Sequence, residues 1–119
     1  MHTCQALVVA CIDFRFQKAL AGWLDRNVGY GNYDRVGLAG GVKDWDAIAG
    51  QIDLSKRLHH IGRVILINHE DCGAYGEAGT FEKHSADLRK AKAEVLKKHP
   101  DVQVDLYYAR LDGTVEAIS

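Results

Sequence analysis

Apolar residues form continuous or alternating runs at four places along the chain, each of which predicts a β-strand. Gln5–Ala10 is a continuous apolar run after its first residue, and Arg63–Asn68 is apolar through its middle, as in strands buried on both faces. Tyr33–Leu38 is predicted as a short strand between them, and Val102–Arg110 alternates well enough for a fourth. A final short strand is expected over Thr114–Ile118, beyond a turn.

Between these runs, apolar residues recur at helical spacing. The first predicted helix starts near Phe14 and is broken at Gly29; the second has Asp44 as its N-cap and is closed by Gly62. The third is longer and charged, and it ends before Pro100. Strands and helices alternate without a Pro-rich linker or an internal repeat. The pattern predicts one α/β domain over residues 1–119, with a mainly parallel sheet of four strands, helices on both faces and a short C-terminal edge strand; the strand order stays open.

Composition narrows the classes of function. The chain has 119 residues and a formal net charge of −1, enough for one core and too little positive charge for a broad nucleic-acid surface. No apolar run is long enough to span a bilayer, and the N-terminus carries no signal pattern, so we expect a cytoplasmic, reducing location and no membrane partner. Three cysteines are too few for a disulfide framework, which directs attention to thiol or metal chemistry.

Three potential metal ligands follow the predicted strands. Cys11 lies just past the first strand, His69 just past the third, and Cys72 three residues later in a turn. In parallel sheets the functional crevice lies beyond the carboxyl ends of the strands, so these side chains converge if the two strands are neighbours. Two thiolates and one imidazole suit tetrahedral Zn²⁺, and three protein ligands leave the open position of a catalytic site. Cys4, at the far end of the first strand, is expected to be structural.

The segment "CIDFR" adds two charged residues beside the first of these ligands. Residues two apart in an extended segment point the same way, so Cys11, Asp13 and Arg15 are expected to share one face. Asp13 would then either bind the metal or accept a hydrogen bond from the hydroxide that the metal generates. Arg15 would hold the carboxylate by a two-pronged pair and keep it ionised.

These two stretches carry a family resemblance. "CIDFR" and "HEDCG" resemble the Cys-x-Asp-x-Arg and His-x-x-Cys-Gly motifs of the β-class carbonic anhydrases, and the "LAGG" loop and the tail "YYARLDGTVEAI" fall where that family would place them. The resemblance implies zinc on Cys11, His69 and Cys72, with Asp13 and Arg15 as the catalytic Asp–Arg dyad. It implies reversible hydration of CO₂ to bicarbonate and a proton. In some members the aspartate moves onto zinc, which makes Asp13 a candidate fourth ligand in a closed state.

The chain departs from that family's pattern in three places. Phe14 stands where the family has a serine, and Gly37–Gly40 replaces its Arg-Asn-Ala-Gly segment. The chain also starts almost at the first strand, without the family's N-terminal helical arm and the pocket glutamine. An exposed sheet edge or apolar helix face left by that arm favours a homodimer or a higher homo-oligomer.

Other functions compete with hydration of CO₂. The same fold could keep its zinc for stability alone, or the enzyme could hydrolyse carbonyl sulfide or carbon disulfide. A Cys11–Cys72 redox pair is a further alternative, since loss of zinc would leave two thiols close together. A phosphatase loop is excluded, because it needs an arginine six positions after its cysteine and that position is Gln17. The histidines on the predicted helices, including His84, are expected at the surface or at caps.

Overall fold

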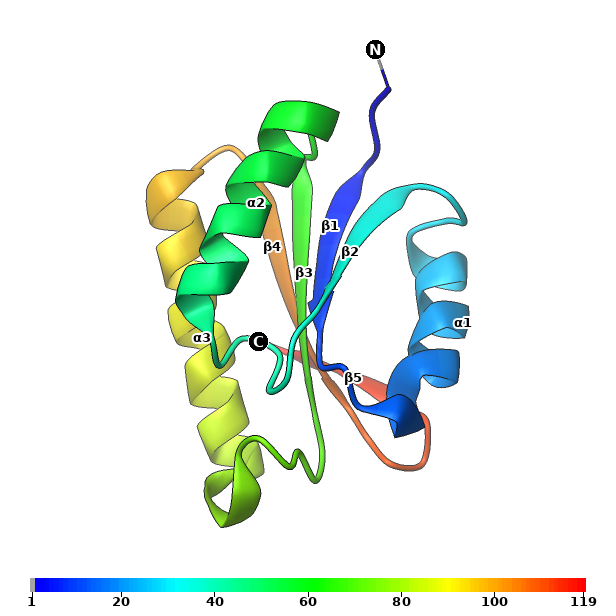
Figure 1. Ribbon diagram of the computed structural model, residues 1–119, viewed down its shortest axis with the longest axis vertical. Helices are drawn as coiled ribbons and strands as arrows, with labels where there is room; N and C mark the ends of the chain where they lie inside the picture. Colours follow the sequence, from blue (N-terminus) through cyan, green and yellow to red (C-terminus); the bar gives the residue numbers. More distant parts are fainter. Residues whose placement is uncertain (1) are drawn as a thin grey trace.

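Strands β1 (Ala6–Ala10) and β3 (Arg63–His69) lie side by side in the middle of a five-stranded sheet in the computed structural model, which describes residues 2–119 (Figure 1). The strand order is β2-β1-β3-β4-β5. β2 (Tyr33–Gly37) and β4 (Gln103–Ala109) pair with them in parallel, whereas β5 (Val115–Ile118) is antiparallel to β4. The predicted fold class is confirmed, and the structure adds the order that the sequence left open.

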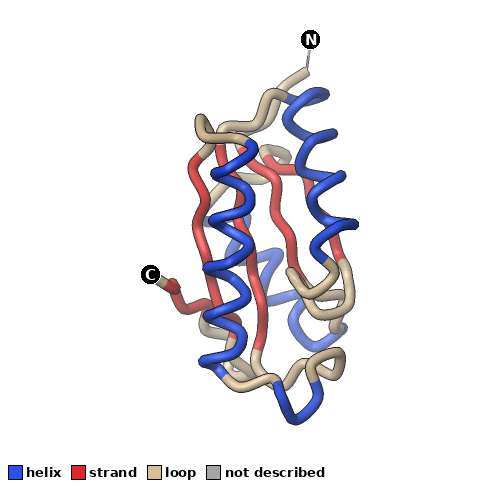
Figure 2. The backbone as a smooth tube through the Cα atoms, turned by 90° about the vertical axis from the view of Figure 1, so that its left-hand side faces the viewer, coloured by secondary structure: helices blue, strands red, loops and turns tan. Residues whose placement is uncertain are grey.

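Helices cover both faces of this sheet. α1 (Gln17–Asn27) packs on one face, and α2 (Trp45–His59) and α3 (Phe81–Lys98) pack on the other (Figures 1 and 2). Each face has its own apolar core, and all five residues of β1 are buried because they are covered from both sides. Among residues 2–119, no helix is both long and apolar enough to cross a membrane.

The parallel pairing of β1 and β3 determines which residues come together at one edge of the sheet. β1 and β3 run in the same direction, with Val9 opposite Leu66, so the residues that follow both strands meet at one edge of the sheet. In Figure 1 this edge is at the bottom, where the loops after β1 and β3 turn back toward α1 and α3. The first residues of both strands lie at the opposite edge, near the N-terminus.

Some element bounds differ from those predicted. The first helix is divided into a 3₁₀ turn, η1 (Phe14–Phe16), and α1, while a second 3₁₀ turn, η2 (Gly76–Ala78), lies in the loop before α3. β3 includes His69 as its last residue, so this side chain is held by the sheet itself. Asp44 does stand at the N-cap position of α2, but its side chain makes no capping hydrogen bond.

The expectation that His84 lies at the surface or at a cap is wrong. Its side chain is fully buried, with the rings of Tyr75 and Tyr108 at centroid distances of 4.0 and 5.4 Å. His84 and Leu88 are four positions apart, so both lie on the face of α3 that packs against the sheet. The amide of Asn68 lies 2.8 Å from His84 Nδ1, which gives this buried imidazole a polar partner.

Candidate metal centre

Cys11, His69 and Cys72 meet at the carboxyl edge of the sheet. One ligand atom from each, two sulfurs and one ring nitrogen, can be chosen so that all lie within 4.8 Å of one another. The two sulfur atoms are 4.0 Å apart, and the three residues are at most 7% exposed. The structure therefore brings together the three residues that the spacing of the strands predicted, in a buried group that could hold a metal ion.

Cys11 is held by the end of β1 and by the loop after β2. The backbone N–H of Gly40 donates to Cys11 Sγ over 3.3 Å, which fixes the position of the sulfur. Gly40 has a φ of +87°, and a Cβ there would lie 2.9 Å from the Cβ of Lys43, so only glycine fits without strain. The "LAGG" loop entered the sequence analysis only as part of the family resemblance, and this contact was not predicted.

His69 presents one ring nitrogen to the cluster. Its Nδ1 lies 2.7 Å from the carbonyl oxygen of Glu70, a group that can only accept, so Nδ1 carries the proton. Nε2 is therefore the ring nitrogen left for a ligand, and it is buried with no hydrogen-bond partner among residues 2–119. The Phe16 ring packs against the imidazole at a centroid distance of 4.2 Å. An orphaned acceptor facing two thiols fits a metal ligand.

The loop that carries Cys72 is fixed from within. The backbone N–H groups of Tyr75 and Gly76 both donate to the Cys72 carbonyl, each at 3.1 Å. Burial raises the pKa of the Cys72 thiol, and the neighbouring Cys11 raises it further. A divalent cation between the two sulfurs would counter both effects, because it stabilises the thiolates.

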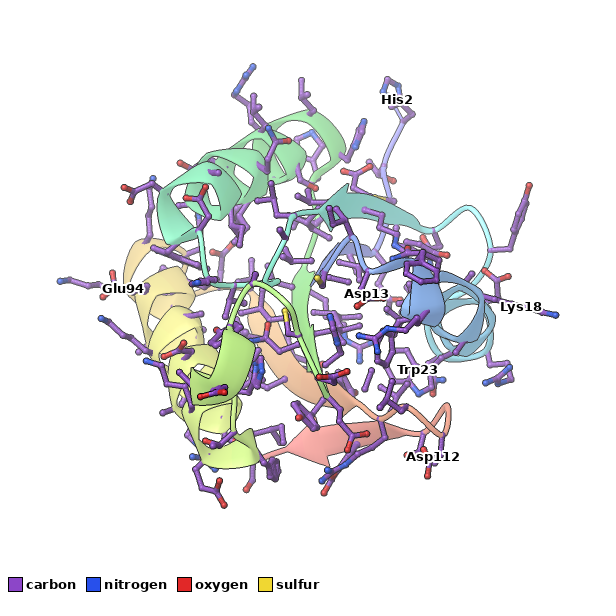
Figure 3. All side chains as sticks on the ribbon, turned by 60° about the horizontal axis from the view of Figure 1, so that its bottom comes forward. His2, Asp13, Lys18, Trp23, Glu94 and Asp112 are labelled. Atoms are coloured by element: carbon purple, nitrogen blue, oxygen red, sulfur yellow. The ribbon has the colours of Figure 1, made fainter. Side chains whose placement is uncertain are left out.

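Asp13 lies beside the cluster of three potential ligands, and Arg15 keeps the Asp13 carboxylate ionised. Its Oδ2 lies 3.8 Å from His69 Nε2 and 2.7 Å from Arg15 Nη2, while Arg15 Nε lies 3.1 Å from Oδ1. The hydrogen bonds from Arg15 hold the pKa of Asp13 at about 2, so the carboxylate is ionised near neutral pH. Figure 3 looks toward this edge of the sheet, with Asp13 labelled.

The local geometry behind this pair differs from the predicted extended segment. Arg15 belongs to the 3₁₀ turn η1, and its backbone N–H donates to Asp13 Oδ1 at 2.9 Å. Asp13 thus caps the turn, and the capping brings the guanidinium back over the carboxylate. The proximity was predicted, but its cause is a turn and not the two-residue repeat of a strand.

Asp71 completes the arrangement and was not predicted. Arg15 Nη1 lies 3.0 Å from the Asp71 carboxylate, and Arg15 Nη2 donates to the Asp71 carbonyl at 2.8 Å. Asp71 adopts a φ of +58°, an uncommon conformation that aspartate tolerates better than most residues. One guanidinium therefore joins the loop after β1 to the loop after β3. The only feature of the sequence that could have predicted this contact is the acidic residue next to Cys72.

Comparison with known proteins agrees with this geometry. A family model described as "Putative carbonic anhydrase" matches residues 1–119, the whole chain. An uncharacterized protein of Rickettsia conorii is 28% identical over 137 residues, covering 99% of this chain and 74% of its own length. An uncharacterized protein of Rickettsia bellii is 26% identical, covering 99% of this chain and 84% of its own length.

Solved structures show the same fold at low identity. The carbonic anhydrase of Streptococcus mutans superposes with a TM-score of 0.77 at 17% identity, over 99% of this chain and 83% of its own. That of Glaciozyma antarctica gives 0.73 at 19% identity, over 100% and 85%. A carbon disulfide hydrolase gives 0.63 at 16% identity, over 99% and 80%. With a family model matched from end to end and this fold, the chain belongs to the family of putative carbonic anhydrases.

Proposed function

We propose that the chain catalyses the reversible hydration of CO₂ to bicarbonate and a proton, with Zn²⁺ bound by Cys11, His69 and Cys72. The observation that supports this most is the unpartnered Nε2 of His69, which faces two buried sulfurs with the ionised Asp13 beside it. A site made for a disulfide alone would not need the imidazole or the carboxylate.

The residues present suit the metal. Two sulfurs and one imidazole nitrogen are ligands that Zn²⁺ prefers, and three protein ligands leave a position for substrate chemistry. A zinc ion held there would act as a Lewis acid that lowers the pKa of water to near neutral and so supplies the nucleophile. Two thiolates cancel the charge of Zn²⁺, which makes the contribution of the neighbouring polar residues more important.

Asp13 and Arg15 have separate tasks in this proposal. Asp13 Oδ2 accepts a hydrogen bond from the reacting water and so directs an oxygen lone pair toward the carbon of CO₂. The low pKa of Asp13 keeps it an acceptor, so it does not return a proton to that oxygen. Arg15 is a positioning residue, since it fixes the carboxylate and forms no part of the predicted ligand set. A closed state, with Asp13 itself as fourth ligand, belongs to the same proposal.

The proposal includes a homodimer or higher homo-oligomer. Phe14 is 86% exposed and Ile12 is 62% exposed, and the two flank Asp13 in sequence. Apolar side chains so exposed next to the candidate metal centre are better explained by a second copy than by contact with water.

The test is stopped-flow hydration of CO₂ by zinc-quantified protein from pH 6 to 9, with Cys72→Ser as the blank and Cys4→Ser as the matched control. The expected result is hydration that disappears with Cys72→Ser and persists with Cys4→Ser, because Cys4 lies at the other end of β1. A chelator should abolish the activity and added zinc should restore it.

Two other results identify the alternatives. Bound zinc at Cys72 without hydration above the blank at any pH would overturn the enzyme and favour a zinc-stabilised, non-catalytic protein. Release of sulfide from carbon disulfide or carbonyl sulfide, without hydration of CO₂, would support the proposed metal centre but identify a different substrate. The carbon disulfide hydrolase of the same fold makes this second assay worth running on the same preparation.

A further inference from the structure

Cys4, Asp34 and His59 form a second group of potential metal ligands at the opposite edge of the sheet. The Cys4 sulfur, an Asp34 carboxylate oxygen and a His59 ring nitrogen all lie within 4.8 Å of one another. Cys4 precedes β1, Asp34 lies near the start of β2, and His59 is the last residue of α2. From this geometry we infer that these residues bind a second divalent cation of the zinc class, at a site separate from that of Cys72.

The scaffold holds the three side chains together before any ion binds. The Cys4 N–H donates to the His59 carbonyl at 3.2 Å, which ties the segment before β1 to the end of α2. His59 Nδ1 lies 2.7 Å from Asp34 Oδ2, and Ser55 Oγ donates to the same oxygen at 2.6 Å. The site is therefore preorganised by contacts of three different segments, which lowers the cost of bringing ligands together.

The donor set also suits the ion. A thiolate, an imidazole and a carboxylate are all ligands of Zn²⁺, and three of them leave a position for water or for another side chain. A cavity of about 260 Å³ opens at this point, lined by His2, Cys4, Tyr33, Asp34 and His59 among others. The His2 ring lies 5.0 Å from the His59 ring, so a second imidazole is near at hand. In Figure 3 His2 projects from the top of the view, away from Asp13.

Binding would exchange protons for the metal. Without metal, Nδ1–H of His59 donates to Asp34, because a carboxylate oxygen can only accept. On binding, Nδ1 gives its lone pair to the ion and its proton leaves that nitrogen. The thiol of Cys4 loses its proton to solvent. Burial raises the pKa of that thiol, and the Asp34 carboxylate adds to the rise, so the ion has to displace a proton. Affinity should therefore increase with pH.

An ordinary ion pair between His59 and Asp34 would account for two of the three residues. It does not account for the partly buried Cys4 sulfur, which packs against the core and lies within 4.8 Å of the ligand atoms of both residues, with a weak 3.6 Å contact to the Ala6 carbonyl. The consequence of metal binding here is a clamp that joins the N-terminal segment to β2 and α2. No part of this inference depends on hydration of CO₂.

The experiment is titration of the metal-free double variant Cys11→Ser/Cys72→Ser with Co²⁺ under a non-thiol reductant. Cys4 is then the only thiol, because the chain has three cysteines. We expect one Co²⁺ per chain with a sulfur-to-cobalt charge-transfer band, which disappears when Cys4→Ser is added. His59→Gln should weaken binding at least tenfold, whereas His60→Asn, the matched control at the next residue, should leave it unchanged.

A folded double variant that binds no Co²⁺, or binds it without the charge-transfer band, would overturn the inference. If that variant fails to fold, cadmium-113 NMR of the otherwise unchanged chain replaces it. Two resonances are then expected, one shifted as for two sulfur ligands and one as for a single sulfur, and Cys4→Ser should remove the second alone. A single resonance that survives Cys4→Ser would equally overturn the second site.

Discussion

Arg15 reaches across 56 positions of sequence to hold Asp71, with Nη1 3.0 Å from the carboxylate and Nη2 2.8 Å from the backbone carbonyl. The same guanidinium holds Asp13. Because β1 and β3 are adjacent and parallel, the loops after these strands are close enough for one side chain to join them. The carboxylate beside the candidate metal centre is thus oriented by both loops that carry the sulfur ligands proposed above.

Asp71→Asn tests whether the second loop helps to orient Asp13. The Asp71 side chain is 71% exposed, and exposed ion pairs contribute only about 0.2–1 kcal/mol, so kcat/KM for CO₂ should fall by no more than about fivefold. Asparagine tolerates the positive φ at this position, so stability should change little. The exposed Asp46, on α2, gives the matched control Asp46→Asn, which should leave kcat/KM unchanged.

Arg15→Lys should cost more than Asp71→Asn. A lysine keeps the charge but cannot donate to both oxygens of Asp13 as the planar guanidinium does, so the carboxylate loses its fixed orientation. Loss of such a supporting contact typically lowers activity roughly 10- to 100-fold. Steady-state hydration kinetics, with zinc content measured in parallel, separate this effect from loss of metal.

The double variant Arg15→Lys/Asp71→Asn shows whether Asp71 acts through Arg15. If it does, Asp71→Asn should change kcat/KM by less than about twofold once Arg15 is lysine, since residues in one network are not additive. Equal effects of Asp71→Asn in both backgrounds would instead give Asp71 a role of its own.

Gly40→Ala should weaken both the fold and the metal centre. Its positive φ disfavours any side chain, and the added Cβ would crowd Lys43, so we expect a loss of about 1–3 kcal/mol in the free energy of unfolding. The displaced N–H would no longer reach Cys11 Sγ, which should lower zinc affinity as well. Denaturant unfolding and competition with a zinc chelator measure the two effects.

Gly50→Ala is the control for that substitution. Gly50 lies inside α2 with open space around its Cα, so alanine there should stabilise the chain by about 0.5–1 kcal/mol and leave zinc affinity unaltered. Equal destabilisation by both substitutions would contradict the argument from backbone geometry at Gly40.

The sequence predicted that Cys11, His69 and Cys72 meet if the first and third strands are neighbours, because the carboxyl ends of parallel strands lie at one edge of a sheet. It could not predict the contacts made by the loops. The Gly40 N–H reaches Cys11 only because of a left-handed turn, and Asp71 reaches Arg15 for the same kind of reason. Such contacts depend on the backbone angles of loops, which the pattern of polar and apolar residues does not predict.

The burial of His84 and the neighbours of Cys4 were missed for a different reason. His84 lies on the same face of α3 as the buried Leu88, yet its polar side chain was taken to indicate exposure. Cys4 was expected to be a small buried residue, and nothing near it in sequence pointed to Asp34 or His59. Both cases depend on partners from other elements, which only the assembled fold brings within reach.

Phe14→Glu should shift the chain toward monomer if a second copy covers the loop after β1. Burial of a phenylalanine contributes about 1.5–3 kcal/mol, so its loss should raise the dimer dissociation constant by at least about tenfold. Tyr30 is 92% exposed in the turn after α1, at the other end of the sheet, and Tyr30→Glu is the matched control. Sedimentation at micromolar concentration decides the matter, and a wild-type monomer would refute the proposed oligomer.

His84 should make stability depend on pH between about 4 and 6.5. Burial lowers the pKa of His84 to about 4, a nearby His69 adds to the lowering, and Asp87 opposes it. Within this range the unfolded chain binds a proton that the folded chain refuses, so stability is fully present above pH 6.5 and is lost as the pH falls toward 4. The difference between the two pKa values corresponds to about 3 kcal/mol.

His84→Asn isolates this contribution. The asparagine oxygen can accept from Asn68 as Nδ1 does now, but it cannot be protonated in this range, so the variant loses this part of the pH dependence. Urea unfolding of metal-free protein at pH 7, 5.5 and 4.5 is the measurement, since metal-free protein removes acid release of zinc from the comparison. The variant should be less stable than wild type at pH 7, because it leaves part of the imidazole volume empty, and the gap should narrow as the pH falls. A gap that stays constant from pH 7 to 4.5 would mean that His84 accepts its proton as readily in the folded chain as in the unfolded one.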